Sequence, residues 1–333
     1  YFADHDERLS MLRSGNGDGI ARMRREVAVG LGAPGLASLP PKFLYDAAGS
    51  ELYERITGLP EYYPTRTEAR LLEAIAPALR RLVRPREIVE LGSGSSSKTR
   101  TILDALAAGP RQATYVAIDV SEAALADATC RLVKDYPGLR VLGLVGEFED
   151  ALAMLLPAPG RLAIFLGGTL GNLTAEQQEL FFARVAASLG PDGHLLIGFD
   201  RRAHAGKPAE RIRVAYDDAE GVTAAFNLNV LRHLNTALGM DFDPTAWVHE
   251  AIYDEHLHQI EMRLVSLRDQ VVHLPGYPDP LKFPAGRRIL TEISRKFAPE
   301  ELAAWLGRRG FTPVRSWTDD QAMFGLMLLQ RRV

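Results

Sequence analysis

The sequence predicts an α/β fold with a central, mostly parallel sheet and a second, smaller α+β domain. In the middle third of the chain, short apolar strands alternate with helical segments, a pattern typical of a parallel sheet covered by helices on both faces. A glycine-rich turn follows the first of these strands, at the edge where such sheets bind ligands. The flanking sequence lacks this alternation, which indicates a separate domain.

The elements of the middle third can be placed from their apolar periodicity. We expect strands at 87–91, 114–119, 139–145, 161–166 and 193–199. We expect helices at 98–108, 121–135 and 175–189. Ser121 can cap the second helix, with Glu122 in its first turn. The strands then end at one edge of one sheet, where the following residues fall: Gly92, Asp119, Glu147, Phe148, Gly167 and Asp200.

The sequence on either side of the middle third predicts a mixture of helices and strands. Residues 1–80 should be mostly helices around loops at 40–50 and 59–69, with Tyr63 extended because it precedes Pro64. In the rest of the chain we expect a helical stretch at 208–238 and strands near 248–254, 258–268 and 287–295. A helix at 299–310 then leads to a strand at 323–330, which closes the central sheet. The predicted domains are 62–200 plus 296–333 for the cofactor and 1–61 plus 201–295 for the substrate.

The turn GSGSSS at 92–97 indicates an adenosine-bearing cofactor. Glycine permits positive φ and close approach of a ligand, and the following helix offers free N–H groups at its N-terminus. Asp119 ends the next strand, 25 residues beyond Gly94, where a carboxylate can bind ribose hydroxyls. A strand–GxG–helix unit serves NAD, FAD and S-adenosylmethionine (SAM) alike, and a tight turn that binds nothing is the ordinary structural alternative.

Two details of the turn favour SAM over a dinucleotide. The third glycine of the dinucleotide fingerprint, which allows close packing around a pyrophosphate, is replaced by Ser97. SAM has no phosphate, and its amino-acid end could use turn carbonyls for the ammonium and a cation such as Lys98 for the carboxylate. The loop therefore favours SAM without deciding the cofactor by itself.

The composition is that of a globular protein without nucleic-acid or membrane partners. The 333 residues are 47% hydrophobic and 24% charged, and the net charge of −3 argues against a nucleic-acid binder. Cys130 is the only cysteine, which excludes internal disulfides and fits a reducing cytoplasm. No apolar run reaches the ~18–20 residues that cross a bilayer. The eight histidines are scattered, so we expect no metal site.

Four further segments are more polar and aromatic than ordinary loops. They contain Tyr45, Tyr62 with Tyr63, Asn172 in FLGGTLGNLT (165–174), and Glu292 with Ser294 in LTEISRKF (290–297). The tyrosines could be half-buried anchors, the asparagine part of a helix cap, and the Glu–Ser pair the solvent face of an edge strand. Met262 could be an ordinary core residue. Taken singly, none of these segments decides the function.

Taken together, the segments resemble the SAM-dependent L-histidine Nα-methyltransferases of ergothioneine biosynthesis. The resemblance rests on PPKFLYDAAGSELYERITGLPEYYPTRTEA, VELGSGSSSKTR, FLGGTLGNLT, YDDAEGVTAAFNLNVL, QIEM and LTEISRKF, and extends from about residue 38 to the C-terminus. It implies a Rossmann-like SAM methyltransferase domain with a substrate-binding domain. The implied reaction is trimethylation of the α-amino group of L-histidine to hercynine, with S-adenosyl-L-homocysteine (SAH) as the other product.

The resemblance also implies roles for individual residues. Around the cofactor it places Tyr62, Gly92, Ser93, Lys98, Asp119, Glu147 and Phe148. Against the backbone of the substrate it places Tyr45, Tyr62, Gly167, Asn172 and Tyr216, and against the imidazole Met262, Glu292 and Ser294. The departures from the family pattern are Glu147 where aspartate is usual, Ser97 where an acidic residue is common, and Gly168 where serine is common.

In the expected mechanism Tyr45 and Asn172 are the catalytic residues. They would orient the lone pair of the amine, while bound water removes its proton. The sequence leaves three rival functions open: an N-methyltransferase for tyrosine, tryptophan or another small amine, a nicotinamide-dependent oxidoreductase, and a SAM-sensing module without catalysis. We expect a monomer located in the cytoplasm.

Overall fold

The computed structural model describes residues 6–14, 19–94, 96–106 and 113–332. The chain divides into two compact units. Unit 1 contains Tyr1–Gly15, Pro64–Arg202 and Lys296–Val333, and unit 2 contains Asn16–Tyr63 and Ala203–Arg295. The sequence predicts that the first residues of the chain belong to the substrate domain. The structure instead places them in unit 1, because the strand Leu9–Arg13 pairs with the large sheet.

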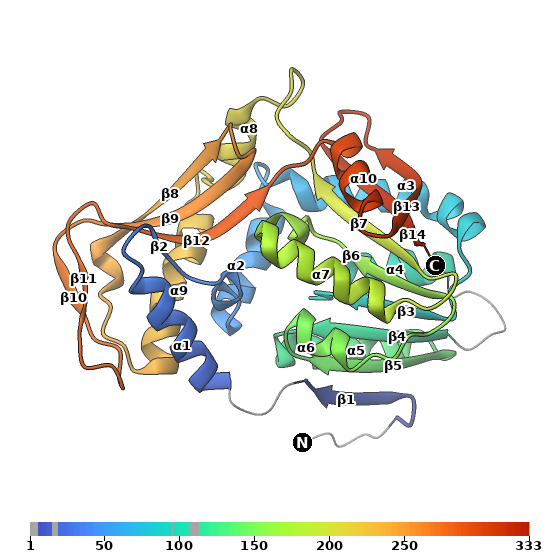
Figure 1. Ribbon diagram of the computed structural model, residues 1–333, viewed down its shortest axis with the longest axis horizontal. Helices are drawn as coiled ribbons and strands as arrows, with labels where there is room; N and C mark the ends of the chain where they lie inside the picture. Colours follow the sequence, from blue (N-terminus) through green and yellow to red (C-terminus); the bar gives the residue numbers. More distant parts are fainter. Residues whose placement is uncertain (1–5, 15–18, 95, 107–112, 333) are drawn as a thin grey trace. The chain divides into compact units, whose positions relative to one another are not determined.

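Unit 1 is built on a sheet with eight strands among the described residues (Figure 1). Their bounds are β1 (Leu9–Arg13), β3 (Glu87–Leu91), β4 (Ala113–Asp119), β5 (Leu139–Val145), β6 (Arg161–Phe165), β7 (His194–Asp200), β13 (Phe311–Thr318) and β14 (Phe324–Arg331). They lie in the order β1-β5-β4-β3-β6-β7-β14-β13. The strands from β1 to β7 pair in parallel, whereas β14 is antiparallel to β7 and to β13. The predicted, mostly parallel central sheet is confirmed.

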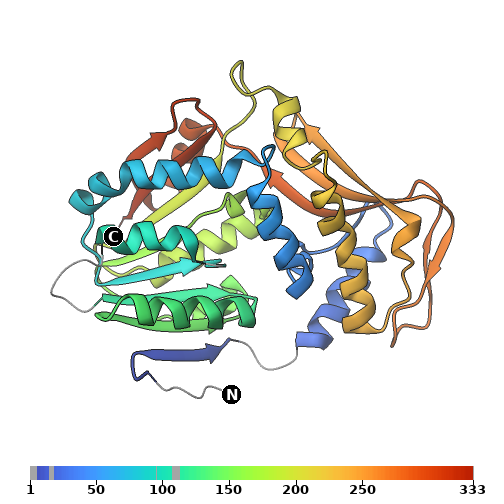
Figure 2. The same ribbon diagram turned by 180° about the vertical axis from the view of Figure 1, so that it is seen from behind.

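Helices cover both faces of this sheet (Figure 2). They are α3 (Tyr63–Leu82), α4 (Ser97–Leu106), α5 (Glu122–Asp135), α6 (Phe148–Ala153), α7 (Ala175–Ser188) and α10 (Pro299–Gly307), with the 3-10 helix η2 (Thr169–Asn172). Leu72 of α3 and Leu132 of α5 pack on one face, and Phe182 of α7 and Leu306 of α10 pack on the other. Burying one such side chain contributes about 1.5–3 kcal/mol, so the two layers hold the strand ends in fixed positions.

The strand order places a ligand-binding edge at the end of β3. This strand has β4 on one side and β6 on the other, so the direction of the chain across the sheet reverses there. Open α/β sheets bind ligands beyond the carboxyl ends of their strands at such a point. The glycine-rich turn occupies this place, and the ends of β4 and β6 lie beside it.

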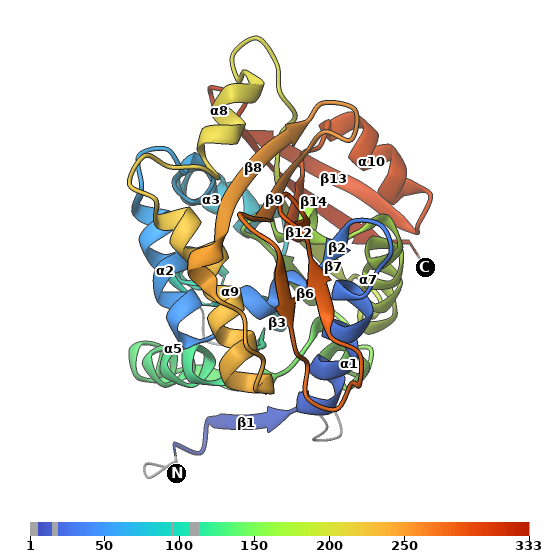
Figure 3. The same ribbon diagram turned by 90° about the vertical axis from the view of Figure 1, so that its left-hand side faces the viewer.

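Unit 2 has an α+β architecture, as the sequence predicts (Figure 3). Its strands are β2 (Ala37–Ser38), β8 (Trp247–Asp254), β9 (Gln259–Ser266), β10 (Gln270–Val272), β11 (Leu281–Phe283) and β12 (Arg288–Arg295). Its helices are α1 (Gly19–Leu31), α2 (Ala47–Gly58), α8 (Ala209–Val214), α9 (Val222–Leu238), η1 (Pro41–Leu44) and η3 (Pro244–Ala246). One sheet has the order β2-β12-β9-β8, and β10 pairs with β11. The helix α9 packs against α2, β8 and β9.

Two helix predictions near the boundaries of the units were wrong. The stretch 208–238 is two helices, because Gly221 adopts a φ of 71° and Asp218 accepts the N–H groups of Val222 and Thr223 at the start of α9. Tyr63 is not extended: it is the first residue of α3. A proline in the first helical turn is tolerated, because the N–H groups there have no intrahelical partner.

The predicted cap of α5 is confirmed in its position, with Glu122 in the first turn, but not in its side-chain hydrogen bond. Ser121 occupies the N-cap position, but its hydroxyl makes no capping hydrogen bond. Its backbone N–H instead donates to the carboxylate of Asp119 at 2.9 Å. The loop preceding α5 is therefore fixed by the acidic residue at the end of β4.

Several short or edge strands of the structure are not predicted from the sequence. In β13, at the edge of the large sheet, Pro313 cannot donate to a ladder, and the register shifts between Pro313 and Arg315. The strand β1 is short and only partly buried. The strands β10 and β11 have three residues each. Such segments show too little apolar alternation for a strand to be recognised.

Candidate active site

The turn after β3 leaves its backbone accessible to a ligand. Gly92 and Gly94 have φ values of 74° and 50°, at which a residue with a side chain would be strained. The Gly92 N–H donates to the carbonyl of Ile118 at 2.8 Å, which fixes the turn to β4. The hydroxyl of Ser93 is buried and has no hydrogen-bond partner among the described residues. Because an unpaired buried hydroxyl costs free energy, this atom marks a place that fits a polar ligand atom.

Asp119 borders the turn from the end of β4. Its Oδ2 accepts the Gly94 N–H at 2.8 Å, and its Oδ1 accepts the Ser121 N–H at 2.9 Å. Each carboxylate oxygen retains a second lone pair, so Asp119 can still accept hydrogen bonds from two neighbouring hydroxyls. Burial raises the pKa of Asp119, and the backbone donors oppose that shift.

Glu147 and Phe148 follow β5 at the same edge. Glu147 is the N-cap residue of α6, without a side-chain capping bond. The Phe148 ring packs edge-on against Phe165, with the ring centroids 5.4 Å apart. Its Cζ lies 3.5 Å from the point where a Cβ on Gly92 would be. The aromatic ring therefore borders the glycine turn directly.

Lys98 and Gly167 are joined by a carboxylate that the sequence analysis did not single out. Glu68 of α3 is fully buried, and its carboxylate lies 2.5 Å from Lys98 Nζ and 2.9 Å from the Gly167 nitrogen. The sequence contains a signal for it, because Glu68 falls on the buried stripe of α3 that continues with Leu71 and Leu72. A charged residue on such a stripe needs a partner.

Asn172 is the last residue of η2, which follows β6. The helix α7 is capped by Thr174 instead: its hydroxyl accepts the Gln177 N–H, and the Gln177 side chain accepts the Thr174 N–H. The capping explanation for Asn172 is therefore wrong. Within the described chain, the Asn172 side chain makes no hydrogen bond, so its amide is available to a ligand.

In unit 2, three tyrosines that the sequence singled out belong to one aromatic cluster. The Tyr62 ring lies 5.9 Å from the Tyr216 ring and 6.4 Å from the Tyr53 ring, measured between centroids. The Tyr45 ring lies 5.4 Å from both Tyr53 and Phe226. Sequence reasoning missed Tyr53 and Phe226, whose roles come from these contacts. Each edge-to-face pair contributes about 0.5–1.5 kcal/mol beyond burial, so the cluster fixes the positions of the tyrosine hydroxyls.

Burial raises the pKa of Tyr62 well above its ordinary value of 10.0. Negative charge on the neighbouring tyrosines and on Glu292 would raise it further. The phenol of Tyr62 therefore keeps its proton at neutral pH and can act as a hydrogen-bond donor.

Glu292, Ser294 and Met262 lie together on two paired strands of unit 2. Glu292 pairs with Met262 across β12 and β9, and Ser294 is two residues further along β12. All three are buried. The Tyr216 hydroxyl donates to Ser294 Oγ at 2.9 Å. The alternative that Glu292 and Ser294 form a solvent-exposed face is therefore wrong.

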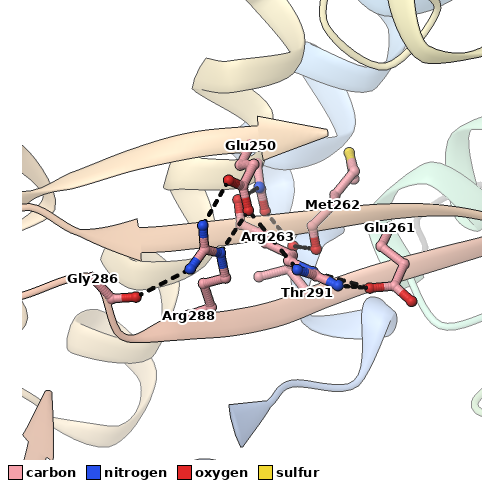
Figure 4. A network of polar contacts seen from close by, with 8 residues as sticks. Glu250, Glu261, Met262, Arg263, Gly286, Arg288 and Thr291 are labelled. Atoms are coloured by element: carbon pink, nitrogen blue, oxygen red, sulfur yellow. Dashed lines mark hydrogen bonds and ion pairs between the residues drawn. The ribbon is translucent and has the colours of Figure 1, made fainter. Parts of the chain in front are cut away.

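A chain of hydrogen-bonded polar groups links Tyr216 to these strands. Thr291 Oγ1 lies 2.6 Å from Asn227 Oδ1 and 3.0 Å from the Met262 carbonyl, the latter contact shown in Figure 4. Asn227 Nδ2 lies 2.8 Å from His249 Nδ1, and His249 Nε2 lies 2.8 Å from the Tyr216 carbonyl. A neutral imidazole with its proton on Nε2 satisfies both contacts. The network holds the Tyr216 backbone relative to β9 and β12.

Acid should destabilise the protein through His249. Burial lowers its pKa below 6.5, against the opposing influence of its backbone hydrogen bond and of Asp217, Asp218 and Glu250. The unfolded chain binds the proton first, so this stabilisation is complete above about pH 6.5 and is lost as the pH falls through the lower, folded pKa. His249→Gln should therefore reduce the loss of stability measured by urea unfolding between about pH 7 and 5. The control is His256→Gln, which changes a histidine in an exposed turn. An equal loss of stability between about pH 7 and 5 in the wild type, His249→Gln and His256→Gln would contradict the prediction.

The structure thus collects the residues singled out from the sequence into two groups. At the carboxyl edge of the large sheet in unit 1 lie Gly92, Ser93, Lys98, Asp119, Glu147, Phe148, Gly167 and Asn172. In unit 2 lie Tyr45, Tyr62, Tyr216, Met262, Glu292 and Ser294. Tyr62, which the resemblance assigns to both ligands, belongs by its contacts to the second group.

The described residues contain neither a metal-binding cluster nor a membrane-spanning helix. No group of three or more histidine, cysteine or acidic side chains there has the arrangement of a metal site. Among the helices in the same part of the chain, none combines the length and the apolar composition that a bilayer span requires.

The fold is that of a methyltransferase of the Rossmann-like class. The chain is similar to the solved structure of a mitomycin 7-O-methyltransferase, with a TM-score of 0.50 and 15% identity. The match covers 93% of this chain and 66% of that one. The turn after β3 and the acidic residue at the end of β4 lie at the edge where such folds bind ligands.

A family model of histidine-specific, SAM-dependent methyltransferases matches residues 23–331. The histidine N-alpha-methyltransferase of Mycolicibacterium smegmatis is 41% identical over 309 residues, which are 93% of this chain and 95% of the relative. That of Mycobacterium tuberculosis is 40% identical over 314 residues, 94% and 96% of the two chains. Ergothioneine biosynthesis protein 1 of Schizosaccharomyces pombe is 29% identical over 306 residues, 88% of this chain and 39% of the relative. The chain belongs to the histidine-specific, SAM-dependent methyltransferase family, and the resemblance seen in its motifs is confirmed.

Proposed function

We propose that this enzyme transfers three methyl groups from SAM to the α-amino nitrogen of L-histidine, forming hercynine and SAH in ergothioneine biosynthesis. The observation that supports this most strongly is the buried pair Glu292 and Ser294 beside Met262. A carboxylate and a hydroxyl on one strand can bind the two nitrogens of an imidazole. The names of the mycobacterial and fission-yeast relatives support the same substrate and pathway.

The hydrogen bond between Tyr216 and Ser294 supports recognition of a neutral imidazole. When Tyr216 donates to Ser294 Oγ, the Ser294 hydroxyl can donate its own proton to the unprotonated ring nitrogen. Glu292 accepts the N–H of the other nitrogen. The resemblance assigned Tyr216 to the substrate backbone. Its contact with Ser294 supports a role at the imidazole end as well.

The residues of unit 1 are suited to hold SAM, which supplies an electrophilic methyl group on a positively charged sulfur. Asp119 has lone pairs for the ribose hydroxyls, and Lys98 can pair with the carboxylate of the amino-acid end. Ser93 Oγ offers an unpaired polar atom, and the Phe148 ring offers an apolar surface for the adenine. Glu147 stands beside that ring with a side chain one methylene longer than aspartate.

The amine must be unprotonated and correctly oriented before each transfer. The Gly167 N–H already donates to Glu68, so we assign its carbonyl to the amine. Tyr45 and Asn172 orient the amine, and the Asn172 amide also binds the substrate carboxylate. Because its raised pKa keeps Tyr62 protonated at neutral pH, this phenol cannot take up the amine proton, and we assign the proton to bound water.

Replacing Asn172 with alanine should raise the KM for histidine by roughly tenfold, the scale of one lost polar contact. The affinity for SAH should not change, because Asn172 is assigned only to the amino acid. Thr174→Ala is the matched control: it removes the cap of α7 and should lower stability with little effect on KM. Unchanged kinetics in Asn172→Ala would remove this residue from the site.

The nearest rival function is methylation of tyrosine, tryptophan or another small amine by the same chemistry. An indole has no second ring nitrogen for Ser294, and a phenol has none at all. A competition assay with labelled SAM and a panel of amino acids tests the choice. We expect label in the histidine product first; preferential labelling of tyrosine or tryptophan would replace histidine as the substrate.

We further propose that the enzyme acts in the cytoplasm as a monomer. The single cysteine supports a reducing compartment, and both ligand-binding groups of residues are present within one chain. Light scattering of the purified protein tests the oligomeric state. A mass twice the 36.6 kDa of the chain would show a dimer.

A further inference from the structure

A buried carboxylate lies between two groups that the proposed function assigns to different ligands. Glu68 is fully buried on α3, on the same stripe as Leu71 and Leu72. Its carboxylate lies 2.5 Å from Lys98 Nζ, which we assign to the carboxylate of SAM. Both of its oxygens lie 2.9 Å from the nitrogen of Gly167, and we assign the carbonyl of that same residue to the histidine amine. A carboxylate in an apolar layer is tolerated only when it is paired in this way.

The neighbouring strand is shaped to admit this carboxylate. Gly198 lies in β7, and a Cβ built there would be 2.0 Å from Glu68 Oε1. Any side chain at position 198 would therefore displace the carboxylate from its partners. The absence of a side chain is not required by the backbone angle, since Gly198 is not among the glycines with positive φ.

The peptide between Leu166 and Gly167 is held from both sides. Glu68 accepts its N–H, and the Leu166 carbonyl accepts the Thr169 hydroxyl at 2.9 Å. Gly167 has a φ of 78°, and a Cβ on it would lie 3.6 Å from Lys98 Nζ. Because a peptide group is planar, these two contacts fix the orientation of the whole Leu166–Gly167 peptide and with it the position of the Gly167 Cα.

We propose that Glu68 is a positioning residue for both ligands. It holds Lys98 in place for SAM and fixes the Gly167 peptide for the histidine amine, and it touches neither ligand itself. This inference rests on the proposed function. It predicts that one substitution in unit 1 weakens the binding of both SAH and histidine, whereas a substitution that only lowers stability should leave both affinities unchanged.

The test is Glu68→Gln, studied by calorimetry with SAH and then with histidine in the presence of SAH. Glutamine keeps the shape but has one acceptor oxygen, so its NH2 group must face either Lys98 or the Gly167 N–H. We expect the Kd values for SAH and for histidine each to rise by about tenfold, as for a lost charge-assisted hydrogen bond.

Glu87→Gln is the matched control. Glu87 pairs with the buried Arg161 at 2.6 Å, at the opposite ends of strands β3 and β6 from the ligand edge. This variant also loses an ion pair of a buried residue in unit 1. We expect a lower Tm with both Kd values within about twofold of the wild type, since no ligand group is disturbed.

Gly198→Ala tests the same idea without changing any charged or polar group. The added methyl displaces the Glu68 carboxylate, so this variant should raise both Kd values as Glu68→Gln does, and it serves as the test if Glu68→Gln does not fold. Wild-type affinities in the variants, or tighter SAH binding, would overturn the inference. Failure of the wild type itself to bind histidine would remove the proposed function, and this assignment with it.

Discussion

Replacing Glu292 with alanine should weaken histidine binding by about one to two orders of magnitude, because a charge-assisted hydrogen bond is worth about 1.5–3 kcal/mol. Glu292 is buried on β12 beside Met262, so water cannot readily take over its role. The loss should appear in the Kd for histidine measured by calorimetry in the presence of SAH. Binding of SAH should stay close to that of the wild type, since Glu292 lies in unit 2 and the assigned carboxylate and ribose contacts lie in unit 1.

Glu250→Ala is the control for this prediction. Glu250 also lies in unit 2, on β8, where it forms ion pairs with Arg263 on the neighbouring strand β9 and with Arg288 on β12 (Figure 4). Removing this carboxylate should leave the affinity for histidine unchanged. Equal losses of histidine and SAH affinity in Glu292→Ala would show instead that Glu292 has a structural role only.

The second large effect concerns stability, at the buried ion pair of Lys296 and Asp200. Lys296 Nζ lies 2.9 Å from Asp200 Oδ2, and the two side chains are 0% and 4% exposed. Removing the ammonium takes this ion pair away from a buried carboxylate, so Lys296→Met should lower the free energy of unfolding by about 3–5 kcal/mol. The adjacent Phe297 N–H donates to the Asp200 carbonyl at 2.9 Å, so a local rearrangement cannot easily bring in water. Urea unfolding followed by circular dichroism measures the change.

Two further variants make this stability prediction specific. Arg131→Met removes the exposed i,i+4 pair with Asp127 on α5 and should change the free energy of unfolding by less than about 1 kcal/mol. Adding Asp200→Leu to Lys296→Met should restore part of the loss, because an apolar pair avoids the buried charge. A loss in Lys296→Met no larger than in Arg131→Met would contradict the prediction.

The large sheet could be predicted from the sequence because its strands are buried on both faces. The strand β3 was predicted at 87–91 and is observed there, and the ends of β4 and β5 also agree. A continuous apolar run between turn residues is a strong local signal. The strands β1 and β13 could not be predicted, because edge strands are partly exposed and their pairing is decided by distant segments.

The same distinction holds for the candidate site. Gly92 and Asp119 could be found because their roles follow from their places at strand ends. The place of Glu68 on an apolar helix stripe is visible in the sequence, but its role is not, because its partners Lys98 and Gly167 are 30 and 99 residues away. His249 is a similar case, since its two contacts join three separate elements of unit 2. Residues that act through tertiary contacts leave little trace in local pattern.

The central claim is that the enzyme methylates the α-nitrogen of histidine three times, and mass spectrometry of the reaction product tests it most directly. Histidine incubated with SAM and the purified protein should gain three methyl units, and fragmentation should place all of them on the α-nitrogen. A product methylated on the imidazole ring, or no methylated histidine while another amino acid is consumed, would contradict the account.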